Sequence, residues 1–474
     1  MSKKILFAAS EALPFVSSGG LADVVYSLPK ALCAQGLDVR VILPLYDSIS
    51  AEMRSKMTFL GKTEVSLSWR RQYCGVFSCV YDGVTFYFID NEYYFHRGNL
   101  YGSYDDGERF AFFGKAVLDS MQITGFFPDI LHAHDWQAAC SVIYLKTHYT
   151  SDSRYGGMRA VFTIHNIEYQ GVYGLEIMSD VFELAPWERN IVEWRGCLNL
   201  MKGAIECCDR LTTVSPRYAE EIKGPEHSHG LDPIIRDKSY KTEGILNGID
   251  PDYYNPKTDA EVFENYTWRS VARKAHNKTA LQRSLALPER EDVPMIALIS
   301  RLTAHKGLDL VSCVIDEILD DDIQFVLLGS GDAEYEAFFR DLERRRGDKV
   351  RSIIKYDKSL SKKIYASADL LLMPSRSEPC GLSQMIASAY GCIPVVRETG
   401  GLFDSIKPYN RYTGEGNGFT FSAYNAHDMM YTVRMAIDYC RDTEFKNKFA
   451  SKIMRIDFSW KSSGEKYARM YEQI

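Results

Sequence analysis

Short apolar segments rich in Val, Ile and Leu recur along the chain, each followed by a loop and then by a segment with helical periodicity. Strands buried in a parallel sheet read as continuous apolar runs, whereas the connecting helices repeat an apolar residue every three to four positions. The pattern is clearest in the C-terminal half, where it predicts strands at residues 295–299, 323–328, 370–373 and 393–396. Such alternation is typical of an α/β protein built on parallel sheets.

The loops that follow these predicted strands carry the residues best suited to chemistry. In the C-terminal half they contain Arg301, Lys306, Glu378 and the run 399–401. In the N-terminal half they are the segments Ser17–Gly20, His132–Asp135 and His165–Tyr169. Ligands of open parallel sheets bind beyond the carboxyl ends of the strands. We therefore expect these loops to form the functional edge of each sheet.

The length of 474 residues exceeds what one hydrophobic core usually supports, so two domains are predicted. We place the boundary after Leu246, because a turn-rich segment begins at Asn247 and the stretch 252–288 reads as charged and irregular. The predicted domains are 1–246 and 247–456, each with a nucleotide-binding style of α/β architecture. The remaining segment, 457–474, reads as an amphipathic helix with Tyr467, Met470 and Tyr471 on one face.

Composition narrows the class of ligand. The net charge is −7 and the isoelectric point is near 5.9, and no basic stripe argues for nucleic acid. Glu11 interrupts the first apolar run, and no other run approaches the ~18 residues that span a membrane. Eleven cysteines without a Cys-x-x-Cys pair indicate neither a disulfide framework nor a zinc ribbon, and we expect most of them to be reduced core residues. These features predict a cytoplasmic protein that acts on a small molecule or a neutral polymer.

Two Gly-Gly-Leu sequences follow predicted strands, one at 19–21 and one at 400–402. A glycine loop that leads into a helix suits an anion, because backbone N–H groups point outward and the helix dipole favours negative charge. A single copy fits a plain tight turn equally well. The presence of a copy in each half favours a binding function.

Arg301, Lys306 and Glu378 each allow two interpretations. Arg301 and Lys306 fit solvated surface cations, or a diphosphate site that would stabilise the charge of a departing nucleotide. Glu378 precedes a predicted helix, so it fits a cap favoured by the helix dipole or a rigid acceptor for sugar hydroxyl groups.

A metal site is a weaker alternative. His132 and His134 lie on one strand face beside Asp135, but the spacer and further histidine of the usual hydrolase pattern are missing. The sequence Asp250-Pro-Asp252 resembles a short metal-binding motif, yet its context reads as a turn. We predict no metal site.

Taken together, the motifs resemble one family, the bacterial glycogen synthases and plant starch synthases. The resemblance runs almost from end to end and includes Glu108–Phe113, His134–Trp136, Thr213–Pro216, Gly244–Asp250, Lys306–Asp309, Glu378–Leu382 and Asp457–Trp460. It implies the GT-B fold, with two Rossmann-like doubly wound domains and a cleft between them. The C-terminal helix would return to the N-terminal domain.

The family resemblance implies a retaining, metal-independent transfer of glucose from ADP-glucose to the non-reducing end of an α-1,4-glucan, with no cofactor. Arg301 and Lys306 would hold the diphosphate, and Glu378 the glucose. His165 would line the reacting face of the sugar, and Asp135 would approach the acceptor. The partners would be a nucleotide sugar and a glucan primer, while the oligomeric state stays open.

The same resemblance assigns substrate binding to a larger set of residues: Ser17, Ser18, Gly19, Gly20, Asp23, Asn166, Asn247, Tyr356, Cys380, Gly381, Leu382, Thr399, Gly400 and Gly401. Within this set, Tyr356 matches the position whose ring stacks on adenine, and 399–401 matches the loop beside the phosphates.

The chain departs from the family pattern at Ser17, where the family has a lysine that reaches the donor. Leu45 replaces a further family cation. Serine cannot supply the missing charge. Three consequences are open: the turnover is reduced, the enzyme uses a different donor, or Arg397 or Lys355 supplies the missing positive charge. A non-catalytic glucan-binding homologue is therefore the alternative hypothesis.

Overall fold

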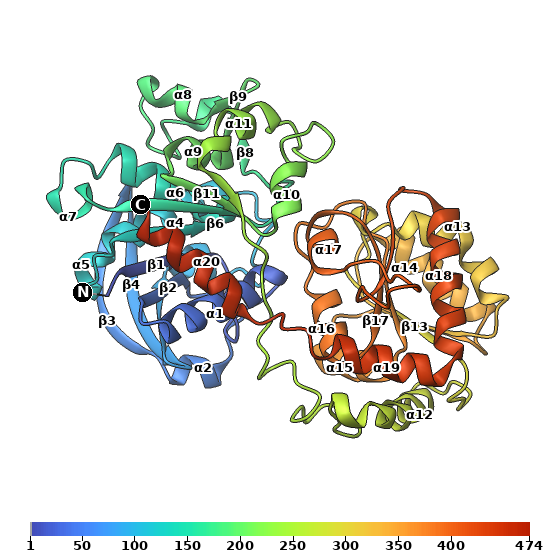
Figure 1. Ribbon diagram of the computed structural model, residues 1–474. Helices are drawn as coiled ribbons and strands as arrows, with labels where there is room; N and C mark the ends of the chain where they lie inside the picture. Colours follow the sequence, from blue (N-terminus) through green and yellow to red (C-terminus); the bar gives the residue numbers. More distant parts are fainter. Residues whose placement is uncertain (1) are drawn as a thin grey trace. The chain divides into compact units, whose positions relative to one another are not determined.

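A computed structural model describes residues 2–474, and these residues form two compact units. Unit 1 comprises Met1–Asn247 and Trp460–Ile474, and unit 2 comprises Gly248–Ser459. The chain therefore leaves unit 1, builds unit 2, and returns to unit 1 with its last helix, α20 (Figure 1).

Unit 1 is organised around a nine-stranded sheet with the order β12-β11-β7-β6-β1-β2-β5-β4-β3. Its strands are β1 (Lys4–Ala8), β2 (Asp38–Pro44), β3 (Thr58–Leu67), β4 (Arg70–Tyr81), β5 (Val84–Asp90), β6 (Ile130–His134), β7 (Arg159–Ile164), β11 (Arg210–Thr213) and β12 (Thr242–Gly244). Neighbours from β12 to β5 pair in parallel, whereas β4 and β3 form an antiparallel hairpin on β5. A smaller sheet contains β8 (Val172–Tyr173), β10 (Cys197–Asn199) and β9 (Glu193–Trp194).

Helices pack on the large sheet of unit 1. The main ones are α1 (Gly20–Ala34), α4 (Asp106–Asp119), α6 (Asp135–Thr147), α9 (Leu200–Cys207) and α20 (Trp460–Glu472). Shorter helices are α2 (Ala51–Ser55), α3 (Glu92–Phe95), α5 (Met121–Thr124), α7 (Ser153–Gly156), α8 (Arg189–Val192), α10 (Pro216–Glu221) and α11 (Asp232–Asp237). Helix α20 packs against α1, where a Cβ on Gly464 would lie 3.6 Å from the Cβ of Ala31 (Figure 1). It buries Tyr467, Met470 and Tyr471, the face predicted from the sequence.

Unit 2 contains a six-stranded, all-parallel sheet with the order β15-β14-β13-β16-β17-β18. The strands are β13 (Met295–Ile299), β14 (Gln324–Leu328), β15 (Val350–Ile353), β16 (Leu370–Met373), β17 (Ile393–Arg397) and β18 (Phe419–Phe421). Its helices are α12 (Lys274–Ser284), α13 (Leu308–Leu319), α14 (Ala333–Arg345), α15 (Lys358–Ser367), α16 (Ser383–Ala389), α17 (Gly400–Ser405), α18 (Ala426–Arg441) and α19 (Thr443–Ile453). The strands predicted at 295–299 and 370–373 are present at those residues.

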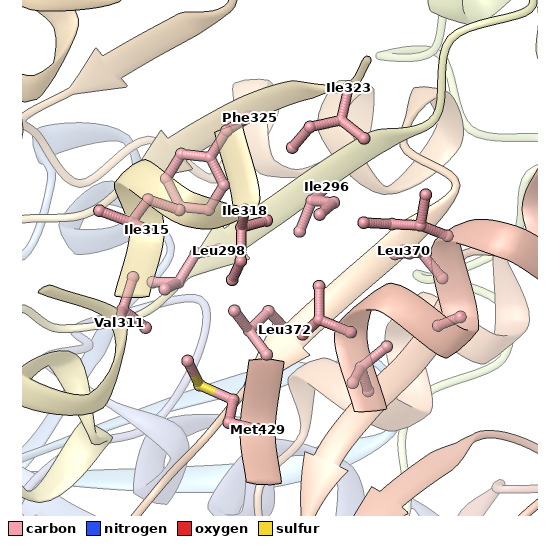
Figure 2. Close-up of a cluster of buried hydrophobic side chains, with 14 of the residues drawn as sticks. Ile296, Leu298, Val311, Ile315, Ile318, Ile323, Phe325, Leu370, Leu372 and Met429 are labelled. Atoms are coloured by element: carbon pink, nitrogen blue, oxygen red, sulfur yellow. The ribbon is translucent and has the colours of Figure 1, made fainter. Parts of the chain in front are cut away.

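The core of unit 2 explains why its strands could be read from the sequence. Side chains of the central strands, including Leu298 and Leu372, are almost fully buried (Figure 2). They pack against an apolar stripe of α13 that contains Val311 and Ile315, and against Met429 of α18. Helices on both faces remove each strand from water, so every position along it can be apolar.

One sequence prediction about this unit is wrong. The sequence predicts an irregular stretch at 252–288, but this stretch contains α12 and a preceding 3₁₀ helix, Trp268–Arg273. The buried face of α12 is largely polar, because Lys274 donates to the carbonyl oxygens of Tyr365, Ala366 and Tyr390 at 3.0 Å each. A helix that buries lysine through hydrogen bonds shows no apolar periodicity in its sequence.

Two further observations concern the whole of residues 2–474. Within this range, no helix combines the length and the apolar character required to cross a bilayer. None of the eleven cysteines in this range forms a disulfide bond.

Candidate active site

The centre of the candidate site in unit 2 is an ion pair between Lys306 and Glu378. Lys306 Nζ lies 2.9 Å from Oε1 and 2.8 Å from Oε2 of Glu378. The two residues follow β13 and β16, which are neighbours in the sheet, so their loops meet at its carboxyl edge. Ser375 Oγ donates to the same carboxylate at 2.8 Å. Glu378 is only 6 % exposed, and its carboxylate is therefore rigidly held.

These contacts keep Glu378 ionised. Burial would raise the pKa of Glu378, but the positive charge of Lys306 and the hydrogen bonds from Lys306 and Ser375 lower it below its ordinary value. A buried carboxylate without such partners would take up a proton instead. The site thus presents one fixed negative and one fixed positive group side by side.

The loop after β17 packs directly on the loop that carries Glu378. The backbone N–H of Gly401 donates to the carbonyl oxygen of Glu378 at 3.1 Å. A Cβ on Gly400 would lie 1.9 Å from that same oxygen, and a Cβ on Gly401 would lie 2.0 Å from the carbonyl oxygen of Cys380. Gly400 also has a φ of +45°. Only glycine fits both positions, so the second Gly-Gly sequence serves close backbone packing.

Gln384 of α16 connects the two loops of unit 2. Its Nε2 donates to the carbonyl oxygens of Cys380 at 3.1 Å and Gly381 at 2.8 Å, and to Ser405 Oγ at 3.0 Å. Leu382 is the N-cap residue of α16, and Thr399 that of α17. The segment 378–382 and the segment 399–401 are therefore one assembly.

The other predicted residues of unit 2 lie further along the same edge. Arg301 is exposed after β13 and has no ion-pair partner among residues 2–474. Tyr356 is 69 % exposed and follows β15, two strands away from β13.

In unit 1, Glu11 organises the first Gly-Gly loop. Its carboxylate accepts hydrogen bonds from the backbone N–H of Ser18, from Ser18 Oγ at 2.9 Å and from Tyr101 Oη at 3.1 Å. Glu11 is 3 % exposed, and burial raises its pKa although these hydrogen bonds oppose the change. The loop itself is exposed at Ser18, Gly19 and Gly20, and α1 begins at Gly20. A Cβ on Gly19 would meet no atom within 4 Å, so this loop, unlike the second, borders open space.

Asp135, His165 and Asn166 come together at the carboxyl ends of β6 and β7. Asp135 Oδ1 accepts from the backbone N–H groups of His165 at 2.7 Å and Asn166 at 3.5 Å. Asp135 has a φ of +57°, a strained conformation for a residue with a side chain. Burial raises the pKa of Asp135 to about 7, although the hydrogen bonds from His165 and Asn166 oppose the shift.

His132, His134 and His165 lie in a row of contacting side chains, and all three are uncharged at neutral pH. His134 Nδ1 lies 3.0 Å from His165 Nε2, and the rings of His132 and His134 stack with centroids 4.3 Å apart. Burial lowers the pKa of His165 to about 3 and that of His134 well below its ordinary value. These side chains can therefore donate or accept hydrogen bonds, but they carry no charge at neutral pH.

The geometry of His132 does not fit the zinc alternative. Its Nδ1 lies 2.7 Å from the hydroxyl group of Tyr471, and its Nε2 lies 2.6 Å from Thr163 Oγ1. Both ring nitrogens are thus engaged by hydroxyl groups. Across residues 2–474, no group of three His, Cys, Asp or Glu side chains is arranged to hold a metal ion. Asp250 accepts from the backbone N–H of Asp252 at 2.8 Å, which is the turn that the sequence predicts.

The remaining predicted residues of unit 1 are Ser17 in the first Gly-Gly loop, Asp23 in α1 and Asn247 at the end of the segment Met1–Asn247. Ser17 Oγ lies 3.5 Å from the carbonyl oxygen of Gly19, and Asp23 lies in the first turn of α1. Asn247 is 5 % exposed, and its Oδ1 has no hydrogen-bond partner among the residues described.

The two cations considered as substitutes for the missing lysine are in unit 2. Lys355 is paired with Asp357 at 2.7 Å. Arg397 donates to the carbonyl oxygens of Ser375 at 3.4 Å and Arg376 at 2.9 Å.

Sequence reasoning missed four residues that build the site: Glu11, Tyr101, Ser375 and Gln384. Glu11 offered a signal, because it is an acidic residue directly beyond a buried apolar strand. Ser375 lies three residues before Glu378, and Gln384 lies within four residues of Cys380 and Gly381, but a single Ser or Gln at such a spacing is too common to indicate these bonds. Tyr101 becomes significant only through its bond to Glu11.

Comparison with known families gives two matches on this chain. Residues 4–237 match the family model described as starch synthase catalytic domain. Residues 282–449 match the model described as glycosyl transferases group 1. The first match lies within unit 1 and the second within unit 2.

Similar proteins extend over the whole chain. A glycogen synthase of Desulforamulus reducens is 49 % identical over 473 residues, which are 99 % of this chain and 98 % of the relative. A glycogen synthase of Geobacillus thermodenitrificans is 48 % identical with the same coverage. Among solved structures, the catalytic domain of starch synthase IV from Arabidopsis thaliana, bound to ADP and acarbose, has a TM-score of 0.94 and 35 % identity. That alignment covers 100 % of this chain and 99 % of the plant domain.

Proposed function

Because this chain belongs to the glycogen synthase and starch synthase family of GT-B glycosyltransferases, we propose that it transfers glucose from ADP-glucose to an α-1,4-glucan. The glucose is added to the non-reducing end with retention of the anomeric configuration. The observation that carries the proposal is the Lys306–Glu378 pair, held at 2.8 Å beside the Gly400–Gly401 turn.

Unit 2 supplies the groups for the donor. Lys306 and the exposed Arg301 bind the diphosphate, and their charges stabilise the negative charge that develops on departing ADP. Glu378 and the backbone at Cys380 and Gly381 bind the glucose hydroxyl groups. The ionised state of Glu378 supports this role, because a carboxylate only accepts hydrogen bonds.

Two further regions of unit 2 complete the donor site. The exposed ring of Tyr356 stacks on the adenine base. The N-terminus of α17, at Thr399–Gly401, faces the phosphates. Leu382 completes this assembly as the residue that precedes α16.

Unit 1 supplies the groups for the sugar and the acceptor. The pKa of His165 near 3 makes it a neutral hydrogen-bonding group beside the reacting sugar, with Asn166 adjacent. Asp135 contacts the acceptor chain, and its pKa near 7 leaves it only partly ionised at neutral pH. Ser17, Ser18, Gly19, Gly20 and Asp23 line the donor side, and Asn247 contributes where the chain leaves unit 1.

The transfer requires no protein nucleophile. The bond between glucose C1 and the β-phosphate oxygen breaks, and the acceptor hydroxyl oxygen forms a new bond to C1 on the same face. The proton of that hydroxyl group moves to the departing phosphate oxygen. The protein's contribution is to orient the two substrates and stabilise charge, and we expect the reaction to need neither a metal nor a cofactor.

The comparisons do not support the alternative of a non-catalytic homologue. Relatives whose alignments cover 99 % of this chain carry the name glycogen synthase. The replacement of the family lysine by Ser17 then affects the rate of glucose transfer and the affinity for the donor. It does not change the class of reaction.

The test is an assay with two donors. The protein is incubated with glycogen and either ADP-glucose or UDP-glucose, with EDTA in excess, and release of the nucleoside diphosphate is measured. We expect ADP-glucose to support transfer. No release from either donor, by protein that still binds glycogen, would contradict the proposal.

A further inference from the structure

We propose that Gln384 of α16 is a positioning residue that directs two backbone N–H groups, those of Gly381 and Leu382, toward the glucose of the donor. The inference rests on the proposed function, which places the glucose beside Glu378 and the backbone at Cys380 and Gly381. Gln384 is fully buried, so it acts through this loop and does not touch the sugar.

The side-chain amide of Gln384 has one orientation that fits its surroundings. Its Nε2 lies 3.1 Å from the carbonyl oxygen of Cys380, 2.8 Å from that of Gly381 and 3.0 Å from Ser405 Oγ. A carbonyl oxygen only accepts hydrogen bonds, and Ser405 already donates its hydroxyl proton to the carbonyl oxygen of Gly401 at 2.6 Å. All three neighbours are therefore acceptors, and the amide must present its nitrogen to them.

The oxygen of the same amide has no partner in the protein. Gln384 Oε1 is buried and accepts no hydrogen bond from residues 2–474. A buried polar atom without a partner costs stability, whereas a leucine would fill this space without that cost. A local rule broken at the expense of stability is typical of functional sites. The observation points to the three bonds from Nε2 as the reason for a glutamine here.

The bonds to the two carbonyl oxygens fix the direction of the neighbouring N–H groups. In a trans peptide unit, the C=O of one residue and the N–H of the next point in opposite directions. Both peptide bonds concerned, 380–381 and 381–382, are trans. Because Gln384 holds the carbonyl groups of Cys380 and Gly381 toward itself, the N–H groups of Gly381 and Leu382 point away from it.

Both of these N–H groups are available to a ligand. Within residues 2–474, neither the N–H of Gly381 nor that of Leu382 donates a hydrogen bond. Both residues are partly exposed, unlike Gln384. Glu378, earlier in the same loop, adds a carboxylate that accepts hydrogen bonds. Donors and an acceptor in one loop match a sugar, whose hydroxyl groups both accept and donate.

The shape of the loop depends on the same contact. Gly381 has a φ of +69°, and a Cβ at this position would lie 2.6 Å from Gln384 Oε1 and 3.1 Å from Glu378 Cγ. The lack of a side chain lets the backbone approach the amide of Gln384 closely. Ser405 extends the support to α17, since it accepts from Gln384 and donates to Gly401. The glucose loop and the start of α17 are therefore joined through one buried amide group.

Gln384→Leu removes the three bonds and keeps a side chain of similar volume. Calorimetric titration of the full chain without primer measures the affinity for ADP-glucose and for ADP, and their ratio reports the contribution of the glucose. We expect the variant to bind ADP-glucose about tenfold more weakly, because two hydrogen bonds to the sugar are misdirected. Its affinity for ADP should change by less than about twofold, and kcat on glycogen should fall by about tenfold.

Two further variants separate the possible causes. Gln282→Leu is the matched control, because Gln282 of α12 is also fully buried and its Nε2 donates to the carbonyl oxygen of Arg290 at 2.9 Å and to Gln324 Oε1 at 2.7 Å. It should lower the Tm and leave the affinity ratio and kcat unchanged. Ser405→Ala keeps the bonds from Gln384 to Cys380 and Gly381, so the affinity ratio should also stay unchanged.

The inference is overturned if Gln384→Leu and Gln282→Leu give the same affinity ratio and the same kcat, since Gln384 then has only a structural role. It is also overturned if Ser405→Ala changes the ratio as much as Gln384→Leu does, because the link to α17 would then be responsible. Gln384→Met, with a longer and more flexible apolar side chain, replaces the leucine variant if that chain does not fold.

The two proposals fail in different ways. If the unmodified chain releases no ADP from ADP-glucose in the presence of glycogen, the proposed function fails. Cys380, which is 6 % exposed, still tests Gln384 without a substrate, because mass spectrometry measures its alkylation by iodoacetamide. We expect faster alkylation of Cys380 in Gln384→Leu than in Gln282→Leu, since the loop is released. Equal rates would show that Gln384 does not hold the loop.

Discussion

The hydroxyl oxygen of Tyr471 lies 2.7 Å from Nδ1 of His132 and joins the last helix of the chain to the strand that carries the candidate site. His132 stacks on His134 with ring centroids 4.3 Å apart, and His134 Nδ1 lies 3.0 Å from His165 Nε2. A continuous series of contacts therefore runs from α20 to a residue proposed to contact the sugar. We infer that Tyr471 is a positioning residue for His165.

Replacing Tyr471 with Phe tests this relationship. The change keeps the buried ring but leaves Nδ1 of His132 without its partner, which costs about 1–3 kcal/mol of stability. We expect a lower Tm and a several-fold lower kcat, with KM for the donor little changed. Tyr144→Phe is the control, because its buried hydroxyl group bonds to the carbonyl oxygen of Phe182. If both variants lower kcat equally, Tyr471 has only a structural role.

The Lys306–Glu378 pair leads to a prediction about rate. Removing Lys306 takes away a charge that stabilises departing ADP, and it leaves Glu378 buried without its cation. We expect Lys306→Ala to lower kcat by roughly 10²–10³. Lys448→Ala, at an exposed position of α19, is the control and should behave like the unmodified chain. A loss below tenfold would show that Lys306 does not act on the leaving group.

The shifted pKa of Asp135 predicts a dependence of stability on pH. Asp135 ionises near pH 7 in the folded chain and near its ordinary value of about 3.9 when unfolded. The folded state therefore binds this proton more tightly. The stabilising contribution is complete below about pH 4 and is lost as the pH rises through 7.

Asp135→Asn should remove this dependence while its side-chain oxygen still accepts from His165. We expect the variant to have a higher Tm than the unmodified chain at pH 8, with a difference that shrinks toward pH 4. Each unit of pKa difference corresponds to about 1.4 kcal/mol. Calorimetry across this range measures the effect, and Asp348→Asn at an exposed position is the control. Parallel Tm curves for Asp135→Asn and the unmodified chain would contradict the prediction.

The sequence predicts the class of fold because the buried strands are continuous apolar runs. The apolar runs at 295–299 and 370–373 are strands with those bounds, since both faces of the sheet are covered. Helix α12 is not predicted from the sequence, because its buried face is polar. Lys274 is buried there and donates to three carbonyl oxygens. Burial through hydrogen bonds carries no signature in an apolar pattern.

The candidate site is only partly visible in the sequence. Loops at strand ends identify Lys306 and Glu378 individually, but their pairing across 72 positions follows from the adjacency of β13 and β16. In the same way, Glu11 reveals its role only through its bonds to Ser18 and Tyr101. The functional roles of these residues stay predictions until the variants are measured.

The two Gly-Gly sequences respond differently to a methyl group. A Cβ on Gly401 would lie 2.0 Å from the carbonyl oxygen of Cys380, whereas a Cβ on Gly19 would meet no atom within 4 Å. We expect Gly401→Ala to lower the Tm by several degrees and Gly19→Ala to leave it unchanged. If the open space at Gly19 receives the donor, Gly19→Ala should raise KM for ADP-glucose. Thermal unfolding and steady-state kinetics measure the two effects, and equal Tm losses would contradict the distinction.

The family resemblance predicts a lysine at the position of Ser17, whose loop borders open space at Gly19. Ser17 Oγ makes only a long contact of 3.5 Å with the carbonyl oxygen of Gly19, so a longer side chain can replace it without breaking strong bonds. Ser17→Lys should add a mobile positive charge at the donor side. We expect a lower KM for ADP-glucose, a higher kcat and an unchanged Tm. Ser17→Gln, similar in length but uncharged, separates the charge from the size. Equal kinetics for the serine and lysine forms would show that the missing charge does not limit this enzyme.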